Sequence, residues 1–239
     1  LRNILYGASP ITPAVLQRAI ETLKCRFTQV YGLTETSGAI SYLQFEDHRG
    51  ERLLSCGRAS FGCDMAIFDP EGQALPPGEL GEIVYRGPGT MAGYWNRPAD
   101  TAAVIREGWF HSGDAGTMDA DGFFYVKDRI KDMVVSGGEN IYPTELESVL
   151  AGHPAVADVA VIGVPDDKWG EVVKAIVVKK HGAELTADAL IDWSRDRLAG
   201  FKRPRSVDFV ETIPRNPSGK ILKRQLREPF WAGATRQVN

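Results

Sequence analysis

Apolar positions near the start of the chain follow two different spacings. Ile4, Leu5 and Tyr6 form a continuous apolar run of the kind found in β-strands. The next segment begins with Thr12-Pro13, in which Thr suits the cap of a helix and Pro its first turn. Apolar residues then recur three and four positions apart, which predicts a helix with one buried face made of Val15, Leu16, Ala19, Ile20 and Leu23.

The middle of the chain, from residue 55 to residue 126, has frequent glycines and short apolar runs. These runs predict strands at 65–68, 82–86 and 123–126, with turns at 69–72 and 119–122 between them. Trp109–Asp114 is interpreted as a Ser-Gly turn that ends in an acid. This part of the chain is therefore predicted to be rich in β-structure.

A densely charged run at 127–132 separates this part from a strand–helix–strand pattern, so we predict a domain boundary at Arg129–Lys131. Helices are predicted at 143–150 and at 186–198, the latter ended by Gly200, with a short basic helix starting at Ile221. The apolar runs between them predict strands at 133–135, 157–164, 172–178 and 207–210. The expected division is 1–128, a hinge at 129–131, and 132–239.

Composition and charge exclude several classes of protein. The 239 residues suffice for one large domain or two modest ones. Their formal charge of -3 is unlike the basic excess of a dedicated nucleic-acid binder. No apolar run approaches the ~20 residues of a membrane-spanning helix. The cysteines, Cys25, Cys56 and Cys63, include no CxxC pair, which argues against a zinc site or disulfide framework and favours a reducing, cytoplasmic location.

Two glycine-rich segments are similar to phosphate-binding motifs but do not satisfy them. A Walker loop needs a glycine five residues before its Gly-Lys pair and Ser or Thr after it, whereas Pro214 and Ile221 occupy these positions around Gly219-Lys220. The segment Gly87–Gly93 has one residue too many, a proline, and no predicted helix after it for a dinucleotide fingerprint. Both motifs are rejected.

Three other segments combine groups that suit nucleotide chemistry. Tyr31–Glu35 holds an aromatic ring, a glycine, a hydroxyl and a carboxylate, which can stack on a base, contact phosphate and bind Mg²⁺. Asp114 could accept ribose hydroxyls, and Lys220 ends the loop Pro214–Lys220. Taken alone, these segments are better explained as an ordinary loop with a buried tyrosine, a turn-capping acid and a solvated surface lysine.

Taken together and in this order, the segments resemble the adenylate-forming enzymes, and most closely the fatty and aryl acyl-CoA synthetases. The resemblance rests on Tyr31–Glu35, Gly78–Val84, Gly93–Trp95, Trp109–Asp114, Asp128–Asp132, Ser136–Asn140 and Pro214–Lys220. It implies an α/β fold: the end of a large N-terminal domain with a small β-barrel-like piece, then a mobile α+β domain. It also implies two half-reactions, formation of acyl-AMP from ATP and a carboxylic acid, then transfer of the acyl group to the thiol of CoA.

The resemblance also implies roles for individual residues. Lys220 would bridge the carboxylate and the α-phosphate, while Thr34 would contact phosphate and Glu35 would bind Mg²⁺. Asp114 and Arg129 would address the ribose. The other residues implied in ATP or AMP binding are Gly7, Ala8, Ser9, Gln29, Tyr31 and Gly32, although Tyr6 stands where the family more often has glycine.

For the second half-reaction, the resemblance implies a rotation about Lys131 that withdraws Lys220 and brings Ser136, Gly137 and Gly138 toward CoA. Glycines would let the pantetheine arm pass close to the backbone. ATP, Mg²⁺, CoA and a carboxylic acid are the expected small molecules, with no tightly bound organic cofactor. Neither nucleic acid nor a membrane-spanning segment is expected, and a homo-oligomer remains compatible with the sequence.

The chain departs from the family in one respect. The main phosphate-binding loop of the family precedes the position of Leu1, so the chain is expected to be part of a longer ligase and to be nearly inactive alone. Medium- or long-chain fatty acids are the expected substrates, with aryl acids second. The alternatives are a module that loads a carrier protein and a truncated binding module; luciferase-like oxidation is more distant. The basic residues Lys223, Arg224 and Arg227 are interpreted as a solvated helix face, with CoA phosphates as the alternative partner.

Overall fold

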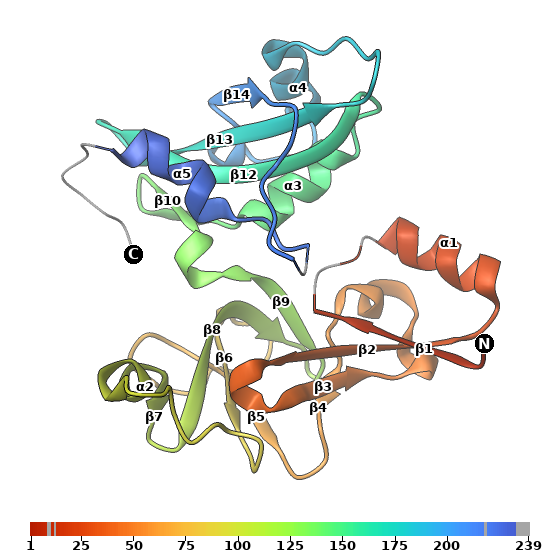
Figure 1. Ribbon diagram of the computed structural model, residues 1–239, viewed down its shortest axis with the longest axis vertical. Helices are drawn as coiled ribbons and strands as arrows, with labels where there is room; N and C mark the ends of the chain where they lie inside the picture. Colours follow the sequence, from red (N-terminus) through yellow and green to blue (C-terminus); the bar gives the residue numbers. More distant parts are fainter. Residues whose placement is uncertain (9–10, 12, 218, 233–239) are drawn as a thin grey trace. The chain divides into compact units, whose positions relative to one another are not determined.

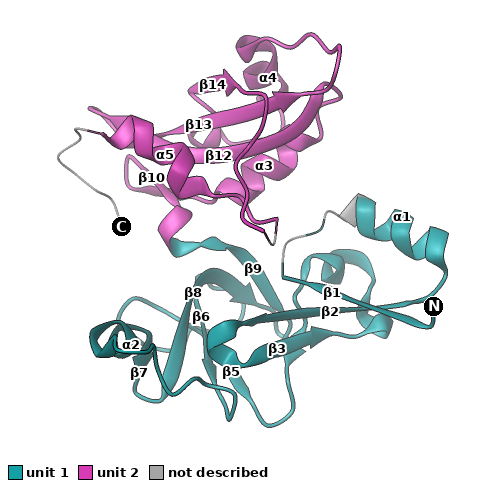
Figure 2. Ribbon diagram, viewed as in Figure 1, with its two compact units in different colours: residues 1–130 teal, residues 131–239 magenta. Residues whose placement is uncertain are grey.

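The computed structural model describes residues 1–8, 11, 13–217 and 219–232. Ser9 and the predicted helix cap Thr12 lie outside the described residues. The chain divides into two compact units, Leu1–Ile130 and Lys131–Asn239, coloured teal and magenta in Figure 2.

The first sheet of unit 1 has the order β1-β2-β3-β4 and is mixed. The parallel pair β1 (Asn3–Gly7) and β2 (Arg26–Leu33) is connected by helix α1 (Pro13–Leu23). Leu16 on α1 is fully buried against Phe27 of β2 and Ala19 and Ile20 pack against the same cluster, whereas Val15 and Leu23 are 47% and 48% exposed, so the predicted apolar face is buried only in part. The strand predicted at Ile4–Tyr6 is confirmed as β1. The antiparallel strands β3 (Gly38–Leu43) and β4 (Arg58–Ala59) complete the sheet (Figure 1).

The second sheet of unit 1 is antiparallel and has the order β5-β6-β8-β7, with β9 paired to β8. It curls like part of a barrel around a small core formed by Ile67, Ile83 and Phe124 with Cys56. The predicted strands at 65–68, 82–86 and 123–126 are confirmed to within one residue at their starts. The elements are β5 (Asp64–Phe68), β6 (Gly81–Arg86), α2 (Pro98–Val104), β7 (Ile105–Arg106), β8 (Trp109–Met118) and β9 (Phe124–Arg129), and the 3₁₀ turns are η1 (Thr34–Thr36), η2 (Phe45–Asp47) and η3 (Gly50–Leu54).

The segment Trp109–Asp114 lies inside strand β8, so its interpretation as a Ser-Gly turn was wrong. Val84 of β6 pairs with His111 and Glu82 pairs with Ala115, so the register shifts between these pairs. Extra residues on β8 therefore form a bulge, and Gly113 has a φ of 70°, which glycine adopts without a steric penalty. The bulge directs the Asp114 side chain into the protein, where it is 3% exposed.

Unit 2 is built on a mixed sheet with the order β11-β10-β13-β12, to which β14 adds beside β13 in parallel. The predicted strands and the helix at 143–150 are confirmed. The strands are β10 (Val134–Ser136), β11 (Glu139–Ile141), β12 (Val156–Asp166), β13 (Gly170–Lys179) and β14 (Ser206–Phe209). The helical elements are η4 (Ile130–Asp132), α3 (Pro143–Ala151), α4 (Ala187–Trp193), η5 (Gly200–Lys202) and α5 (Lys223–Trp231).

Strand β12 is buried on both faces, which explains its nearly continuous apolar sequence. Val159 and Val161 belong to a core cluster with α3 and α4, whereas Ala160 and Ile162 belong to a second cluster with α5. Because successive side chains of a strand point to opposite faces, the two clusters lie on opposite sides of the sheet. The helices α3 and α5 therefore cover opposite faces of this sheet (Figure 1).

Two helix predictions needed correction. The helix predicted at 186–198 ends at Trp193, where buried Ser194 bonds the Ile191 carbonyl through its own hydroxyl at 2.6 Å. Such a local bond competes with continued helix formation. Gly200 accordingly begins the 3₁₀ turn η5 instead of ending a helix. The basic helix starts at Lys223, two residues later than predicted.

No helix in the described ranges combines the length and the apolar character that crossing a bilayer requires.

Candidate functional site

Asp114 lies at the centre of a polar cluster in unit 1. Its Oδ2 accepts the Tyr31 hydroxyl at 2.6 Å, and its Oδ1 lies 2.7 Å from Nε of Arg129. Tyr31 comes from β2, and Arg129 is the direct register partner of Asp114 on β9. Burial, followed by the neighbouring carboxylate, raises the pKa of Tyr31 far above its usual value, so this hydroxyl stays protonated and donates. The three predicted residues are therefore in direct contact.

A second layer of contacts fixes the bulge that carries Asp114. Glu82 Oε1 accepts the Gly113 N–H at 2.9 Å, and Glu82 Oε2 lies 2.7 Å from His111 Nδ1. The Ser112 hydroxyl donates to the Ile83 carbonyl and accepts the Asp114 N–H. Glu82 was not proposed as a site residue from the sequence, although it lies in the motif Gly78–Val84.

Glu35 is held by a tyrosine that sequence reasoning also left without a role. Glu35 Oε1 accepts the Tyr94 hydroxyl at 2.9 Å, and the Glu35 carbonyl accepts the Met91 N–H. Burial and this carboxylate raise the pKa of Tyr94. Thr34 begins η1 and is exposed. The sequence could have indicated Tyr94 as a site residue through its position in the motif Gly93–Trp95.

Gly7 and Ala8 lie where β1 ends, and Gln29 lies beside this end within β2, as the register partner of Tyr6. A Cβ on Gly7 would come within 2.2 Å of the Val30 carbonyl oxygen, so only glycine fits there. Tyr6 donates to Gln29 Oε1 at 3.2 Å and lies 2.9 Å from His48 Nε2. Carboxyl ends of parallel strands are common ligand positions.

Gly32 lies where the register between β2 and β3 shifts. A Cβ on Gly32 would meet the Gly38 carbonyl oxygen at 1.9 Å. Glycine at this position therefore lets the two backbones approach beside Tyr31, as a β-bulge requires.

In unit 2, Ser136, Gly137 and Gly138 join β10 to β11. Both glycines have positive φ, 60° and 90°, as the tight hairpin turn requires. The Gly137 N–H donates to the Trp169 carbonyl at 2.8 Å, and the Trp169 ring lies so close that a Cβ on Gly137 would meet it at 2.7 Å. The backbone at this hairpin is therefore open on one side and covered by an aromatic ring on the other.

Lys220 is also in unit 2, and its side chain is exposed at the end of the loop that starts at Pro214. The described part of this loop is closed by backbone bonds and by Arg215, which pairs with Asp158 of β12 at 2.7 Å. No role was assigned to Arg215 from the sequence.

The basic residues of α5 are not a uniformly solvated face, contrary to the sequence interpretation. Lys223 pairs with Glu147 of α3 at 2.8 Å. Arg227 donates to the Lys131 carbonyl at 3.0 Å and to Asp132 at 3.1 Å. Lys223 and Arg227 are thus engaged within unit 2, whereas Arg224 is exposed. The contacts of Arg227 fix the segment beside Lys131.

Trp169, Gly170 and Glu171 lie where the turn after β12 leads into β13. Trp169 lies in a turn, but Glu171 belongs to β13 and is 5% exposed. Its Oε2 accepts the Val135 N–H at 3.3 Å, and burial raises its pKa.

Metal binding and thiol chemistry have limited support among the described residues. These residues contain no group of three or more His, Cys, Asp or Glu side chains placed to hold a metal. Glu35 could therefore contribute one carboxylate to a cation, whose other ligands would be substrate oxygens and water. The cysteines are free, and burial raises the pKa of Cys56 to about 12, which makes its thiol unreactive.

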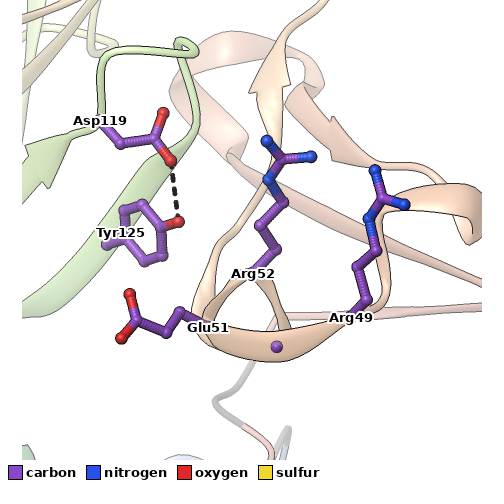
Figure 3. Close-up of a pocket in the computed structure, with 6 residues that line it drawn as sticks. Arg49, Glu51, Arg52, Asp119 and Tyr125 are labelled. Atoms are coloured by element: carbon purple, nitrogen blue, oxygen red, sulfur yellow. Dashed lines mark hydrogen bonds between the residues drawn. The ribbon is translucent and has the colours of Figure 1, made fainter.

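A hollow of about 520 Å³ in unit 1 lies apart from the predicted site residues (Figure 3). Three of the side chains that line it, Arg52, Asp119 and Tyr125, already have partners. Tyr125 donates to Asp119 at 3.0 Å, and Arg52 pairs with Asp121 at 2.6 Å while covering the ring of Phe123. We therefore assign it no ligand. It is lined by Arg49, Gly50, Glu51, Arg52, Asp119 and Tyr125.

Comparison with known families gives two matches. Residues 1–95 match the AMP-binding enzyme family, and residues 145–220 match the AMP-binding enzyme C-terminal domain. Among curated proteins, a feruloyl-CoA synthase of Amycolatopsis sp is 49% identical over 230 residues, which is 96% of this chain and 46% of that protein. A fatty acid–[acyl-carrier-protein] ligase, ScoC of Streptomyces coeruleorubidus, is 44% identical over 241 residues, 100% of this chain and 46% of that protein.

Solved structures agree with these matches. ATP-bound MatB from Rhodopseudomonas palustris aligns with a TM-score of 0.88 at 34% identity, covering 97% of this chain and 46% of that one. An o-succinylbenzoate CoA synthetase, MenE from Bacillus subtilis, in complex with ATP and magnesium ion, aligns at 0.85 with 40% identity, covering 94% of this chain and 46% of that one. The chain spans about half the length of the relatives it matches.

Proposed function

The chain belongs to the AMP-binding, or adenylate-forming, enzymes, and on this premise we propose that the natural protein containing it is an AMP-forming acid–thiol ligase. In the first half-reaction a carboxylate oxygen bonds to the α-phosphorus of ATP, and pyrophosphate leaves. In the second, a thiol sulfur bonds to the acyl carbon, and AMP leaves. The supporting observation is the buried Asp114 carboxylate held between Tyr31 and Arg129.

Asp114 and Arg129 are proposed to bind the ribose. A carboxylate offers about four acceptor positions, so Asp114 can accept ribose hydroxyls while it keeps its bonds to Tyr31 and Arg129. Both partners prevent the carboxylate from turning away. Gly7 and Ala8 at the end of β1, and Gln29 beside them in β2, are proposed to line the adenine pocket, together with Ser9, which is outside the described residues. Tyr31 and Gly32 would complete this pocket.

Thr34 and Glu35 are proposed to act at the phosphates. Glu35 Oε1 is fixed by Tyr94, which orients the carboxylate as a single ligand of Mg²⁺. Mg²⁺ commonly takes one or two carboxylates and completes its coordination with substrate phosphates and water, so one carboxylate fits. The cation, when bound, would neutralise phosphate charge.

Lys220, Ser136, Gly137 and Gly138 are proposed to serve different half-reactions. Lys220 would bring a positive charge to the carboxylate and α-phosphate, which repel each other. The Gly137-Gly138 hairpin would give the pantetheine arm of CoA a close approach to backbone. We propose that residues 129–131, between domains 1–128 and 132–239, are the hinge that exchanges these two groups.

The acid and the thiol are the finer parts of the proposal. We propose a medium- or long-chain fatty acid and CoA, in a reducing cytoplasmic setting that suits the free cysteines. A hydroxycinnamate-type aryl acid is the second candidate, favoured by the 49% identity to a feruloyl-CoA synthase. An acyl-carrier protein is the second candidate for the thiol, favoured by the identity of 44% to ScoC.

Acid-dependent AMP release tests this proposal. The natural protein would be incubated with ATP, CoA or carrier protein, and a panel of fatty and aryl acids, in parallel with Lys220→Ala. We expect one class of acid to support AMP release, and Lys220→Ala to lower the adenylation rate by about ten- to a hundred-fold, since a charge-assisted contact contributes ~1.5–3 kcal/mol.

The same assay tests whether residues 1–239 act alone. We propose that they are nearly inactive, since relatives with ligase names are about twice as long. Absence of AMP release by the natural protein with every acid would contradict the ligase proposal. Rapid AMP release by residues 1–239 alone would contradict only this second statement.

A further inference from the structure

The loop that carries Lys220 is closed at its base by apolar packing. Ile213 is 7% exposed and belongs to the core cluster between β12 and α5, and Ile221 packs against the same cluster. The Leu222 N–H donates to the Pro214 carbonyl at 2.9 Å, and Arg215 and Ile221 form an antiparallel bridge. The two ends of the loop are therefore held side by side.

Asn216 holds the backbone of Lys220 from both sides. The Lys220 N–H donates to Asn216 Oδ1 at 2.9 Å, and the Lys220 carbonyl accepts the Asn216 N–H at 2.9 Å. The Gly219 N–H donates to the Asn216 carbonyl at the same distance, with Gly219 at a φ of 84°. These hydrogen bonds therefore fix the position of the Lys220 backbone relative to Asn216.

Arg215 connects this small loop to the sheet. Its Nη1 donates to the Gly219 carbonyl at 2.7 Å, directly before Lys220. Its Nη2 donates to both carboxylate oxygens of Asp158, at 2.9 and 2.7 Å. Asp158 is itself fixed, because its Oδ1 accepts the Val159 N–H at 3.0 Å in β12. One planar guanidinium thus joins the residue before Lys220 to a strand 57 positions away in sequence.

We propose that Asp158 and Arg215 form a clamp that positions Lys220 for adenylation, so that Arg215 is a positioning residue acting through the loop. The proposal rests on the role of Lys220 in the proposed function. The clamp contributes little to the stability of unit 2, because Arg215 and Asp158 are 40% and 34% exposed as side chains and such pairs are nearly neutral in water. Its effect is geometric, since a shift of about 1 Å can slow a reaction a hundred-fold.

The two half-reactions, measured separately, test the clamp in the natural protein. Adenylation is followed as acid-dependent exchange of pyrophosphate into ATP without thiol, and thioester formation is followed from synthetic acyl-adenylate. We expect Arg215→Gln and Asp158→Asn to slow pyrophosphate exchange about ten- to a hundred-fold and to change thioester formation less than two-fold. Arg195→Gln is the matched control, since Arg195 forms a similar exposed pair with Asp192 at 2.6 Å elsewhere in unit 2.

A double variant tests whether the two residues act together. The variant Asp158→Asn/Arg215→Gln should be no slower than Arg215→Gln alone, because the contact is already absent. Losses that multiply in the double variant would contradict the clamp. Equal loss of both half-reactions in Arg215→Gln would also contradict it and would indicate a general defect of unit 2. Pyrophosphate exchange within two-fold of the unchanged protein would exclude a positioning role.

Hydrogen exchange separates failure of the clamp from failure of the proposed function. In Arg215→Gln, the backbone amides of Gly219 and Lys220 should exchange at least several-fold faster than in the unchanged protein, while amides of β12 keep their rates. Faster amide exchange supports the clamp even if no acid supports pyrophosphate exchange. Absence of pyrophosphate exchange with every acid would contradict the ligase proposal alone. Unchanged amide exchange in the loop would contradict the clamp.

Discussion

Asp114 is a buried carboxylate whose cost of desolvation is offset by its partners. It is 3% exposed, and its two oxygens contact the Tyr31 hydroxyl and the Arg129 guanidinium. Burial removes several kcal/mol of hydration from a charge, and without such partners this loss would not be compensated. The same bonds that make the burial tolerable also fix the direction of the carboxylate. At this position, stability and the proposed ribose binding therefore depend on the same contacts.

Tyr31→Phe tests this dependence. The variant removes one hydrogen bond to a buried charge, so we expect it to lower the free energy of unfolding by about 1.5–3 kcal/mol, measured by urea denaturation. Tyr42→Phe is the control, because Tyr42 lies in the same sheet but is 36% exposed. The free energy of unfolding of Tyr42→Phe should stay within about 0.5 kcal/mol of that of the unchanged protein. Equal stability of the two variants would contradict a stabilising role for the Tyr31–Asp114 bond.

At the scale of elements, Glu171 connects two strands that share little else. The register of β10 with β13 consists of the single pair Ser136 and Gly170. Glu171 adds a side-chain bond to the Val135 N–H and fills the space beside Gly163, where a Cβ would come within 2.3 Å of its Oε2. The placement of the Gly137-Gly138 hairpin therefore depends on a buried acid.

The raised pKa of Glu171 predicts how stability depends on pH. Burial raises its pKa in the folded state above the ordinary value of 4.5, so between 4.5 and the raised value the folded state binds more protons than the unfolded state. The contribution of Glu171 to stability is therefore present at low pH and decreases as pH rises through this window. The stability of Glu171→Gln relative to the unchanged protein should increase from pH 4.5 upward.

Urea denaturation from pH 4 to pH 7 measures this difference. Glu184→Gln is the charge-matched control, because Glu184 is exposed in the same unit. The free energies of unfolding of Glu171→Gln and the unchanged protein are compared at each pH. If their difference does not vary with pH, Glu171 does not titrate in this window.

At the scale of the whole chain, the division between the two units follows Ile130 and falls inside η4. The charged run 127–132 provides few apolar contacts that could oppose a rotation at this position. On the side of unit 2, Arg227 donates to the Lys131 carbonyl. Because this hydrogen bond holds the backbone after Lys131, the backbone could turn at the rotatable bonds before it. This geometry is compatible with the proposed hinge.

Lys131→Pro tests the hinge, because proline fixes φ near −65° and restricts the preceding residue. We expect the variant to keep one half-reaction and to lose most of the other, in the two assays described above. Lys131→Ala keeps backbone freedom and should support both half-reactions. Equal loss of both half-reactions in Lys131→Pro would contradict the hinge assignment.

Strands and motifs could be read from the sequence because they depend on local spacing. The apolar run at 157–164 predicted a strand, and the positions of Tyr31, Asp114 and Lys220 within their motifs indicated nucleotide chemistry. The end of α4 could not be read in this way. Its apolar pattern continues to Leu198, but the hydroxyl of Ser194 bonds the Ile191 carbonyl at the point where the helix ends.

The sequence by itself determined the elements with clear local spacing and the resemblance to the family, since these follow from residue chemistry at short range. It did not show that Trp109–Asp114 is part of a strand. Only the tertiary structure decided which side chains meet. Tyr31 and Asp114 are 83 positions apart, and their contact depends on a strand register and a bulge that local spacing does not specify. Asp158 and Arg215 meet for the same reason, since strand β12 and the Lys220 loop are brought together by a shared apolar core. Contacts between distant segments are set by packing, and packing is a property of the whole fold.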